Sequence, residues 1–238
     1  MCKKSLAFST SILLLFLVGC GEVKEKKEQV TPKKTKTTQT DSLTSSEKIE
    51  EKAEEPFLLN EENAIDFFFD YEKTLTRNKV RLTTSMGSFT IELFDNVPYH
   101  RANFIYLTQK EYFNNTMFHR VVKGFIIQGG NSDNRETSKK RTKIGRYLLP
   151  PDVKKGHKHH RGVISMPSGE IDNPHKLASP FEFFIVVTKP GSYHLDGSYT
   201  PFGRVIEGMN IVDKINNVPI DDGDWPMQNV YILKAEVL

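Results

Sequence analysis

Short segments of alternating polarity run from residue 79 to the end of the chain and constrain the fold more than any other feature. Lys79 to Ser85 and Ser88 to Phe94 each alternate, and Met86-Gly87 between them supplies a turn, so a β-hairpin is predicted. Further strand-like segments follow at 116–122, 125–128, 162–166, 181–188, 202–206 and 230–238. Helical patterns begin at Pro98 and cover 208–216. Many short strands with two helices predict a mainly β protein built as a closed antiparallel barrel with capping helices.

Composition argues against several other classes of protein. The 238 residues carry a net charge of +3, which is too close to neutral to argue for a nucleic-acid partner. Both cysteines, Cys2 and Cys20, lie in the first twenty residues, so we expect neither a disulfide framework nor a cysteine metal site in the body of the protein. No apolar run reaches the roughly 18 residues that a membrane-spanning helix needs.

Residues 1–19 are typical of a secretory signal, with a positive start at Lys3-Lys4 and an apolar stretch centred on 12–18. The tetrad Leu17-Val18-Gly19-Cys20 resembles the lipobox of bacterial lipoproteins, which implies cleavage before Cys20 and lipid attached to that residue. Several acyl chains would hold the protein firmly on a membrane of the bacterial cell envelope. Gly21 provides no acidic retention signal, which favours the outer membrane. The alternative is a buried N-terminal helix.

Residues 20–56 are predicted to form a disordered tether. From Gly21 to Pro56 there is no aromatic residue, and eight Lys are mixed with nine acidic residues. Such a segment buries too little apolar surface to offset its conformational entropy. An interaction segment is the alternative interpretation.

Residues 57–78 are predicted to be a helical extension with one amphipathic helix over about 61–75. Ile65, Phe68, Phe69 and Leu75 fall near helical spacing and are expected to pack on the main domain. The run Phe67-Phe68-Phe69 could instead mark a site for a partner.

Residues 79–238 contain four blocks that resemble the cyclophilin-type peptidyl-prolyl isomerases. The blocks are Phe118-His119-Arg120-Val121-Val122 with 124–130, Gly162-Val163-Ile164-Ser165-Met166, Phe183-Phe184-Ile185, and Leu195-Asp196-Gly197 with 202–205. Because four blocks agree in order and spacing, the resemblance is specific. It implies an eight-stranded barrel with two helices, and a shallow outer groove that binds proline-containing polypeptides without a cofactor or metal.

The reaction makes few chemical demands, because no bond is broken. Rotation about the X-Pro bond has a barrier of ~18–20 kcal/mol that comes from C–N double-bond character. A cation that donates to the proline nitrogen lowers this barrier, since the lone pair becomes available only as conjugation is lost. The resemblance implies that Arg120 is this catalytic donor and that Gln128 orders the arginine and the substrate carbonyl. A surface ion pair for Arg120 and a strand-end role for Gln128 are the alternatives.

The resemblance also implies a substrate-binding pocket. Phe125, Met166, Phe184 and Leu195 match the apolar pocket for the proline ring, and each could instead belong to the barrel core. Strand neighbours point to opposite faces, so only one of Phe183 and Phe184 can face the groove. His119 is expected to line the edge of the groove rather than act as an acid or base.

Three departures from the family pattern affect the predicted groove. His194 and Tyr199 stand where many eukaryotic members have Trp and His, and they look like the bacterial branch. The stretch 167–180 differs, so peptide contacts cannot be transferred there. Glu182 replaces a common Gln, and an exposed Glu182 would favour basic residues in the substrate.

The segment Asn131 to Arg161 is a basic insert that carries ten Lys or Arg. We expect a solvated loop. The alternatives are a patch that meets acidic partners or anionic surfaces, and metal capture by His157, His159 and His160.

The sequence therefore predicts a lipid-anchored, monomeric prolyl isomerase that helps exported proteins to fold. A proline-recognition or chaperone module without catalysis is the main rival. A surface adhesin that uses the basic insert is a third hypothesis.

Overall fold

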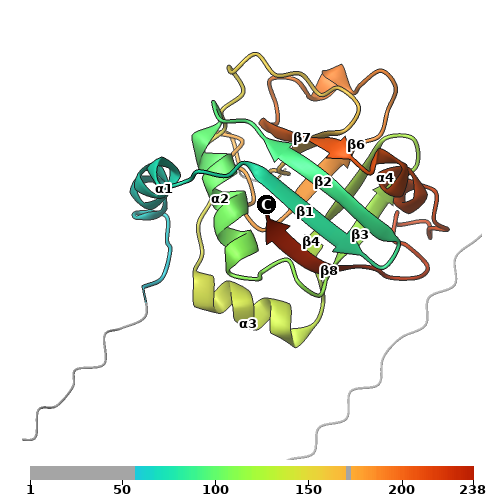
Figure 1. Cartoon of the computed structure of the whole chain (residues 1–238), viewed down its shortest axis with the longest axis horizontal. Helices are drawn as coiled ribbons and strands as arrows, with labels where there is room; N and C mark the ends of the chain where they lie inside the picture. Colours follow the sequence, from blue (N-terminus) through green and yellow to red (C-terminus); the bar gives the residue numbers. More distant parts are fainter. Residues whose placement is uncertain (1–56, 170–172) are drawn as a thin grey trace, which may run out of the picture. The chain divides into compact units, whose positions relative to one another are not determined.

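Eight strands form the body of the molecule (Figure 1). The computed structural model describes residues 57–169 and 173–238, so the predicted signal, Cys20 and the tether lie outside the described residues. The strands pair in the closed order β1-β2-β7-β5-β6-β4-β3-β8, and all pairs are antiparallel. The predicted eight-stranded barrel is thereby confirmed. The strands are β1 (Lys79–Thr84), β2 (Gly87–Leu93), β3 (Thr116–Val122), β4 (Ile126–Asn131), β5 (Val163–Ser165), β6 (Phe183–Val186), β7 (Pro201–Glu207) and β8 (Val230–Val237).

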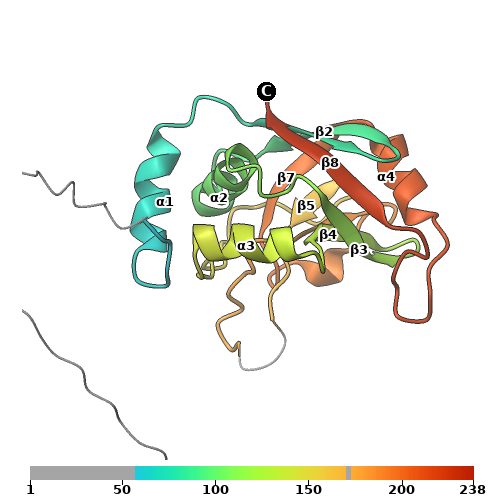
Figure 2. The same cartoon turned by 90° about the horizontal axis from the view of Figure 1, so that it is seen from below.

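Two helices lie at opposite ends of the barrel, as Figures 1 and 2 show. They are α2 (Pro98–Gln109) and α4 (Met209–Asn216), and both are predicted from the sequence. Phe104 of α2 places its ring 4.9 Å from that of Phe113 and 5.6 Å from that of Phe183. α2 therefore closes the apolar core at one end. Among the described residues, no helix has both the length and the apolar character needed to cross a membrane.

The helical extension contains α1 (Ala64–Lys73), but its packed face differs from the predicted one. Phe68 is fully buried, whereas Ile65 and Phe69 are 41% and 52% exposed. The helix instead turns Phe67 and Tyr71 toward Tyr106 of α2, with ring centroids 5.2 and 5.6 Å apart. Three consecutive phenylalanines fit more than one helical stripe, so spacing alone cannot select the buried one.

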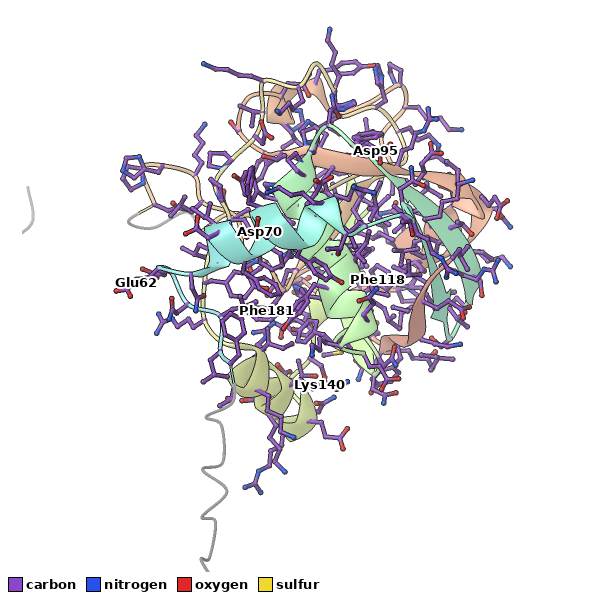
Figure 3. All side chains as sticks on the ribbon, turned by 60° about the vertical axis from the view of Figure 1, so that its left-hand side comes forward. Glu62, Asp70, Asp95, Phe118, Lys140 and Phe181 are labelled. Atoms are coloured by element: carbon purple, nitrogen blue, oxygen red, sulfur yellow. The ribbon has the colours of Figure 1, made fainter. Side chains whose placement is uncertain are left out.

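The basic insert contains a helix, α3 (Arg135–Ile144), so the expectation of a loop is wrong for these residues. Asn134 caps its start, because its side-chain oxygen accepts a hydrogen bond from the backbone N–H of Thr137 at 2.7 Å. Gly145 ends it with φ +120°, close against the backbone of Leu59, where a side chain would not fit. Lys140, labelled in Figure 3, fixes α3 to the segment between α2 and β3 by donating to the backbone oxygens of Glu111 and Asn114.

A buried histidine on α2 makes the stability of the fold depend on pH. His100 is completely buried, and within the described residues neither of its ring nitrogens has a hydrogen-bond partner. Burial lowers the pKa of His100 to about 3, below the 6.5 of an ordinary histidine. The unfolded chain therefore binds the extra proton between these pH values. The free energy of unfolding therefore keeps its full value with respect to His100 above about pH 6.5. Between about pH 6.5 and pH 3 it falls by up to about 1.4 kcal/mol per pH unit.

We expect His100→Leu to flatten this acid-side slope, because leucine has no charge to gain in the unfolded state. Urea unfolding of the full chain at pH 7.5, 6.0 and 5.0 measures the slope. His175→Leu, at an exposed histidine, is the control and is expected to leave it unchanged. An unaltered slope in His100→Leu would show that another group governs acid unfolding.

Candidate functional site

Three of the predicted residues form a row on the outside of the barrel. Arg120 of β3 lies directly opposite Gln128 of β4, and Gln128 lies opposite Phe184 of β6. Directly paired residues project from the same face of a sheet. A register shift between Phe118 and Arg120 interrupts the inward-outward alternation of β3 just before the row. The sheet itself therefore brings the cation, the amide and the aromatic ring side by side.

This row lies in a groove with a volume of about 470 Å³. Six of the nine predicted site residues line it, together with three that the sequence analysis does not select. The lining residues are Arg120, Phe125, Ile126, Gln128, Pro167, Ser168, Phe184, Leu195 and Tyr199.

One part of the groove is apolar. Ile126, Phe184 and Val186 form a small buried cluster of their own, and Phe125, Leu195 and Tyr199 pack against it. The ring of Tyr199 stands at 90° to that of Phe184, with centroids 5.4 Å apart. Phe183 points inward to the main core, as strand alternation predicts. The cluster leaves a shallow apolar surface beside Gln128.

Arg120 is 46% exposed, and its Nε lies 3.4 Å from Oδ2 of Asp224. Asp224 comes from the turn that precedes β8, and its backbone oxygen accepts a hydrogen bond from the N–H of Val121 at 2.8 Å. Within the described residues, this Nε contact is the one ion pair of Arg120, and it leaves the terminal guanidinium nitrogens to meet a ligand. The sequence contains no local signal for this contact, because the two residues are far apart along the chain.

Gln128 is oriented by Glu182 rather than by Arg120. Its Nε2 donates to Glu182 Oε2 at 3.0 Å, and Asn131 Nδ2 donates to Glu182 Oε1 at 3.1 Å. A carboxylate can only accept, so Gln128 must turn its amino group toward it. Gln128 Oε1 is then left as an acceptor for an N–H group in the groove. From the sequence we expect Gln128 to order Arg120 directly. In the described part of the chain, however, the two side chains form no hydrogen bond with each other: Gln128 bonds to Glu182, and Arg120 pairs with Asp224.

Glu182 is held inside a network and is only 19% exposed. Burial alone would raise the pKa of Glu182, but hydrogen bonds from His119 and Gln128 and the charges of His119 and Arg141 outweigh it and hold that pKa below its usual value. Arg141 of α3 donates to Asn131 Oδ1 at 3.0 Å and lies 3.9 Å from Glu182. Arg141 also covers the ring of Phe181, labelled in Figure 3 beside α3. The unexpected helix thus contacts the hydrogen-bond network that orients Gln128.

Three predicted residues do not line the groove. Met166 is 1% exposed and belongs to the main core, so the prediction that it contacts the proline ring is wrong. Ile126, which the sequence analysis does not select, lines the groove. His119 lies behind the row, with Nε2 3.4 Å from Glu182 Oε2. His194 is exposed and stacks on Phe125, with ring centroids 5.4 Å apart.

The three histidines of the basic insert have separate partners. His157 Nε2 forms a hydrogen bond with Asn96 Oδ1, and His160 Nδ1 forms one with the hydroxyl of Tyr193. His159 is fully buried behind Phe184, where its ring nitrogens contact Asp196 Oδ1 at 2.7 Å and Ser165 Oγ at 2.9 Å. In the described ranges no group of three or more His, Cys, Asp or Glu is arranged so that it could hold a metal ion.

The chain resembles known prolyl isomerases in sequence and in structure. The family model described as cyclophilin type peptidyl-prolyl cis-trans isomerase/CLD matches residues 79–237. Peptidyl-prolyl cis-trans isomerase-like 3 of Dictyostelium discoideum is 37% identical over 158 residues, which cover 66% of this chain and 92% of that protein. Peptidyl-prolyl cis-trans isomerase-like 2 of Rhizopus delemar is 35% identical over 171 residues, which are 71% of this chain but 30% of that longer protein.

A crystal structure of a cyclophilin type peptidyl-prolyl cis-trans isomerase from Cryptosporidium parvum matches with a TM-score of 0.58 and 29% identity, covering 68% of this chain and 98% of that one. A second Cryptosporidium parvum structure, in the presence of the dipeptide Ala-Pro, matches with a TM-score of 0.56 and 30% identity, covering 67% of this chain and 98% of that one.

Proposed function

Since the chain belongs to the cyclophilin-type peptidyl-prolyl cis-trans isomerases, we propose that its outer groove binds a prolyl residue and that Arg120 promotes rotation about the X-Pro bond. One observation carries the proposal: Arg120, Gln128 and Phe184 stand in a single cross-strand row inside the groove. The half-exposed guanidinium can donate a hydrogen bond to the uncharged prolyl amide, while the apolar surface beside it can bind the proline ring.

In this mechanism the proline ring packs on the apolar cluster of Ile126 and Phe184, bordered by Phe125, Leu195 and Tyr199. The proline nitrogen then faces Arg120. As the amide twists, its nitrogen regains a localised lone pair that accepts a hydrogen bond from the guanidinium. This bond is absent from the planar ground state, so it stabilises the transition state selectively.

Asp224 and Glu182 prepare the two polar groups for this step. The ion pair with Asp224 restricts Arg120 before the substrate arrives, so less rotamer entropy is lost on binding. Glu182 fixes the amide of Gln128, whose Oε1 accepts from an N–H of the substrate backbone. His194 stacks on Phe125 at the edge of the groove, whereas His119 supports Glu182 from behind, and neither takes part in proton transfer.

The substrates on this proposal are proline-containing segments of exported polypeptides, and the protein acts as a monomer that assists their folding. The Ala-Pro dipeptide named for the Cryptosporidium parvum relative supports a prolyl ligand for the same fold. The rival is a module that binds such segments without catalysis. Acceleration of cis-to-trans exchange by the full chain supports the enzyme, whereas binding of such segments without acceleration favours the rival.

We further propose that lipid on Cys20 anchors the protein in a bacterial envelope, most simply in the outer membrane. The support is the sequence Leu17-Val18-Gly19-Cys20 after an apolar stretch. The relatives named above are eukaryotic, so the lipoprotein form depends on this chain's own N-terminus.

Cys20→Ser is therefore expected to move the full chain from the membrane fraction to the soluble fraction and to abolish labelling by radioactive palmitate in a bacterial host. The substitution removes the sulfur that would carry the lipid. Cys2→Ser is the matched control, and it should leave both properties unchanged. Continued palmitate labelling of Cys20→Ser would refute the anchor.

A further inference from the structure

The turn between α4 and β8 is a preformed hairpin. The N–H of Asp221 donates to the backbone oxygen of Trp225 at 2.9 Å, and Ile220 and Pro226 form an antiparallel bridge. Asp221 Oδ1 also accepts from the N–H groups of Gly223 and Trp225, each at 2.9 Å. These bonds fix the backbone of the turn before any ligand arrives.

Two large apolar side chains project from this hairpin into solvent. Trp225 is 40% exposed and Met227 is 73% exposed, whereas Pro226 between them is buried. Trp225 and Met227 therefore flank a buried residue, and both present their side chains to water. Neighbouring exposed apolar side chains on a turn with a fixed backbone offer a preformed apolar contact surface.

The hairpin is joined directly to the catalytic strand. Asp224 accepts from the N–H of Val121 and pairs with Arg120, and the ring of Trp225 lies 6.1 Å from that of His119. In the barrel order β6-β4-β3-β8, the hairpin leads into β8 and so lies across β3 from the apolar cluster of β4 and β6. A polypeptide whose proline occupies that cluster would meet the hairpin after passing Arg120.

We propose that Trp225 and Met227 form a subsite for a bulky apolar side chain, preferably aromatic, that flanks the proline of the substrate. The inference rests on the proposed function of the groove. Each residue of an extended peptide advances about 3.3 Å, so a residue within about three positions of the proline can reach a surface that borders Arg120. Tryptophan offers a large rigid face that loses little entropy on contact.

The charges around the hairpin favour an apolar occupant over a basic one. Asp221 is used to fix the turn, and Asp224 is paired with Arg120. Asp222 is the remaining carboxylate in the turn, and it is exposed to water, where a single charge contributes little. The apolar area of Trp225 and Met227 is therefore the main source of binding energy that the hairpin offers.

Exchange rates of host peptides test the subsite in the full chain. The peptides carry one Pro in an alanine background, with Phe placed in turn at each of three positions on either side. At one position Phe is expected to raise kcat/KM by about three- to tenfold over Ala. This gain should vanish in Trp225→Ala and return in part in Trp225→Phe. Leu233→Ala removes a side chain of β8 that is 50% exposed, and it should keep the gain.

Fluorescence provides a second readout, because Trp225 is the single tryptophan of the 238 residues. Its emission should shift to shorter wavelength when the preferred Phe peptide is added and should stay constant with the all-alanine peptide. Acceleration of the alanine peptide without any gain from Phe would overturn the subsite alone, as would a larger gain from Arg than from Phe. No acceleration of any peptide by the folded chain would overturn the proposed function as well.

Discussion

Replacing Arg120 by alanine is expected to lower kcat/KM for cis-to-trans exchange of an X-Pro peptide by about 100- to 1,000-fold, as removal of a transition-state donor does in other enzymes. The guanidinium is the one cation that lines the groove, among the residues that the structure describes. Its side chain is half exposed on the outer face of β3, so alanine costs no core packing. The comparison uses the full chain and one alanine-flanked peptide, with circular dichroism to verify the fold.

Arg204 provides a matched control for this substitution. It is also an exposed arginine on a strand, 60% exposed on β7, and it pairs with Glu92 at 3.0 Å much as Arg120 pairs with Asp224. Arg204→Ala is expected to retain kcat/KM within about twofold, because it removes a surface ion pair only. If both variants lose activity equally, or if Arg120→Ala stays as active as the parent, Arg120 is not the donor.

The barrel could be predicted from the sequence because its strands are short, alternating and separated by turns. Lys79–Thr84 and Gly87–Leu93 are found where the alternation places them. α3 could not be predicted in this way, because only Thr137 and Ile144 of its ten residues are buried and no apolar stripe marks it. Local capping by Asn134 and contacts with distant backbone, rather than amphipathicity, stabilise it.

The sequence predicts those residues of the candidate site that lie within the four blocks shared with the family. Arg120, Gln128 and Phe184 follow from the resemblance, and strand alternation correctly separates Phe184 from Phe183. Ile126 sits inside the matched block, so alternation along β4 could have distinguished it from Ile127, which is buried in the core. Contacts between distant segments, such as that of Asp224 with Arg120, leave no pattern along the chain.

Glu182→Leu is expected to lower kcat/KM by about 10- to 100-fold, although Glu182 does not line the groove. Leucine has a similar size but cannot accept the hydrogen bonds from Gln128 and Asn131. The amide of Gln128 then loses the contact that fixes its orientation and can present either end to the substrate. The loss should appear mainly in kcat, since the apolar cluster that holds the proline ring is untouched.

Glu182→Gln distinguishes this positioning role from a general effect on folding. Glutamine keeps an oxygen that accepts from Gln128, so most of the lost kcat should return. Both variants also leave Arg141 without its carboxylate, which lies 3.9 Å away, so they share any loss of stability that comes from that ion pair. Glu182→Leu alone leaves the amide of Gln128 unsatisfied at a cost of about 1–3 kcal/mol, and urea unfolding measures this difference. If the two variants lose kcat equally at the same folded fraction, the charge of Glu182 rather than its hold on Gln128 supports the reaction.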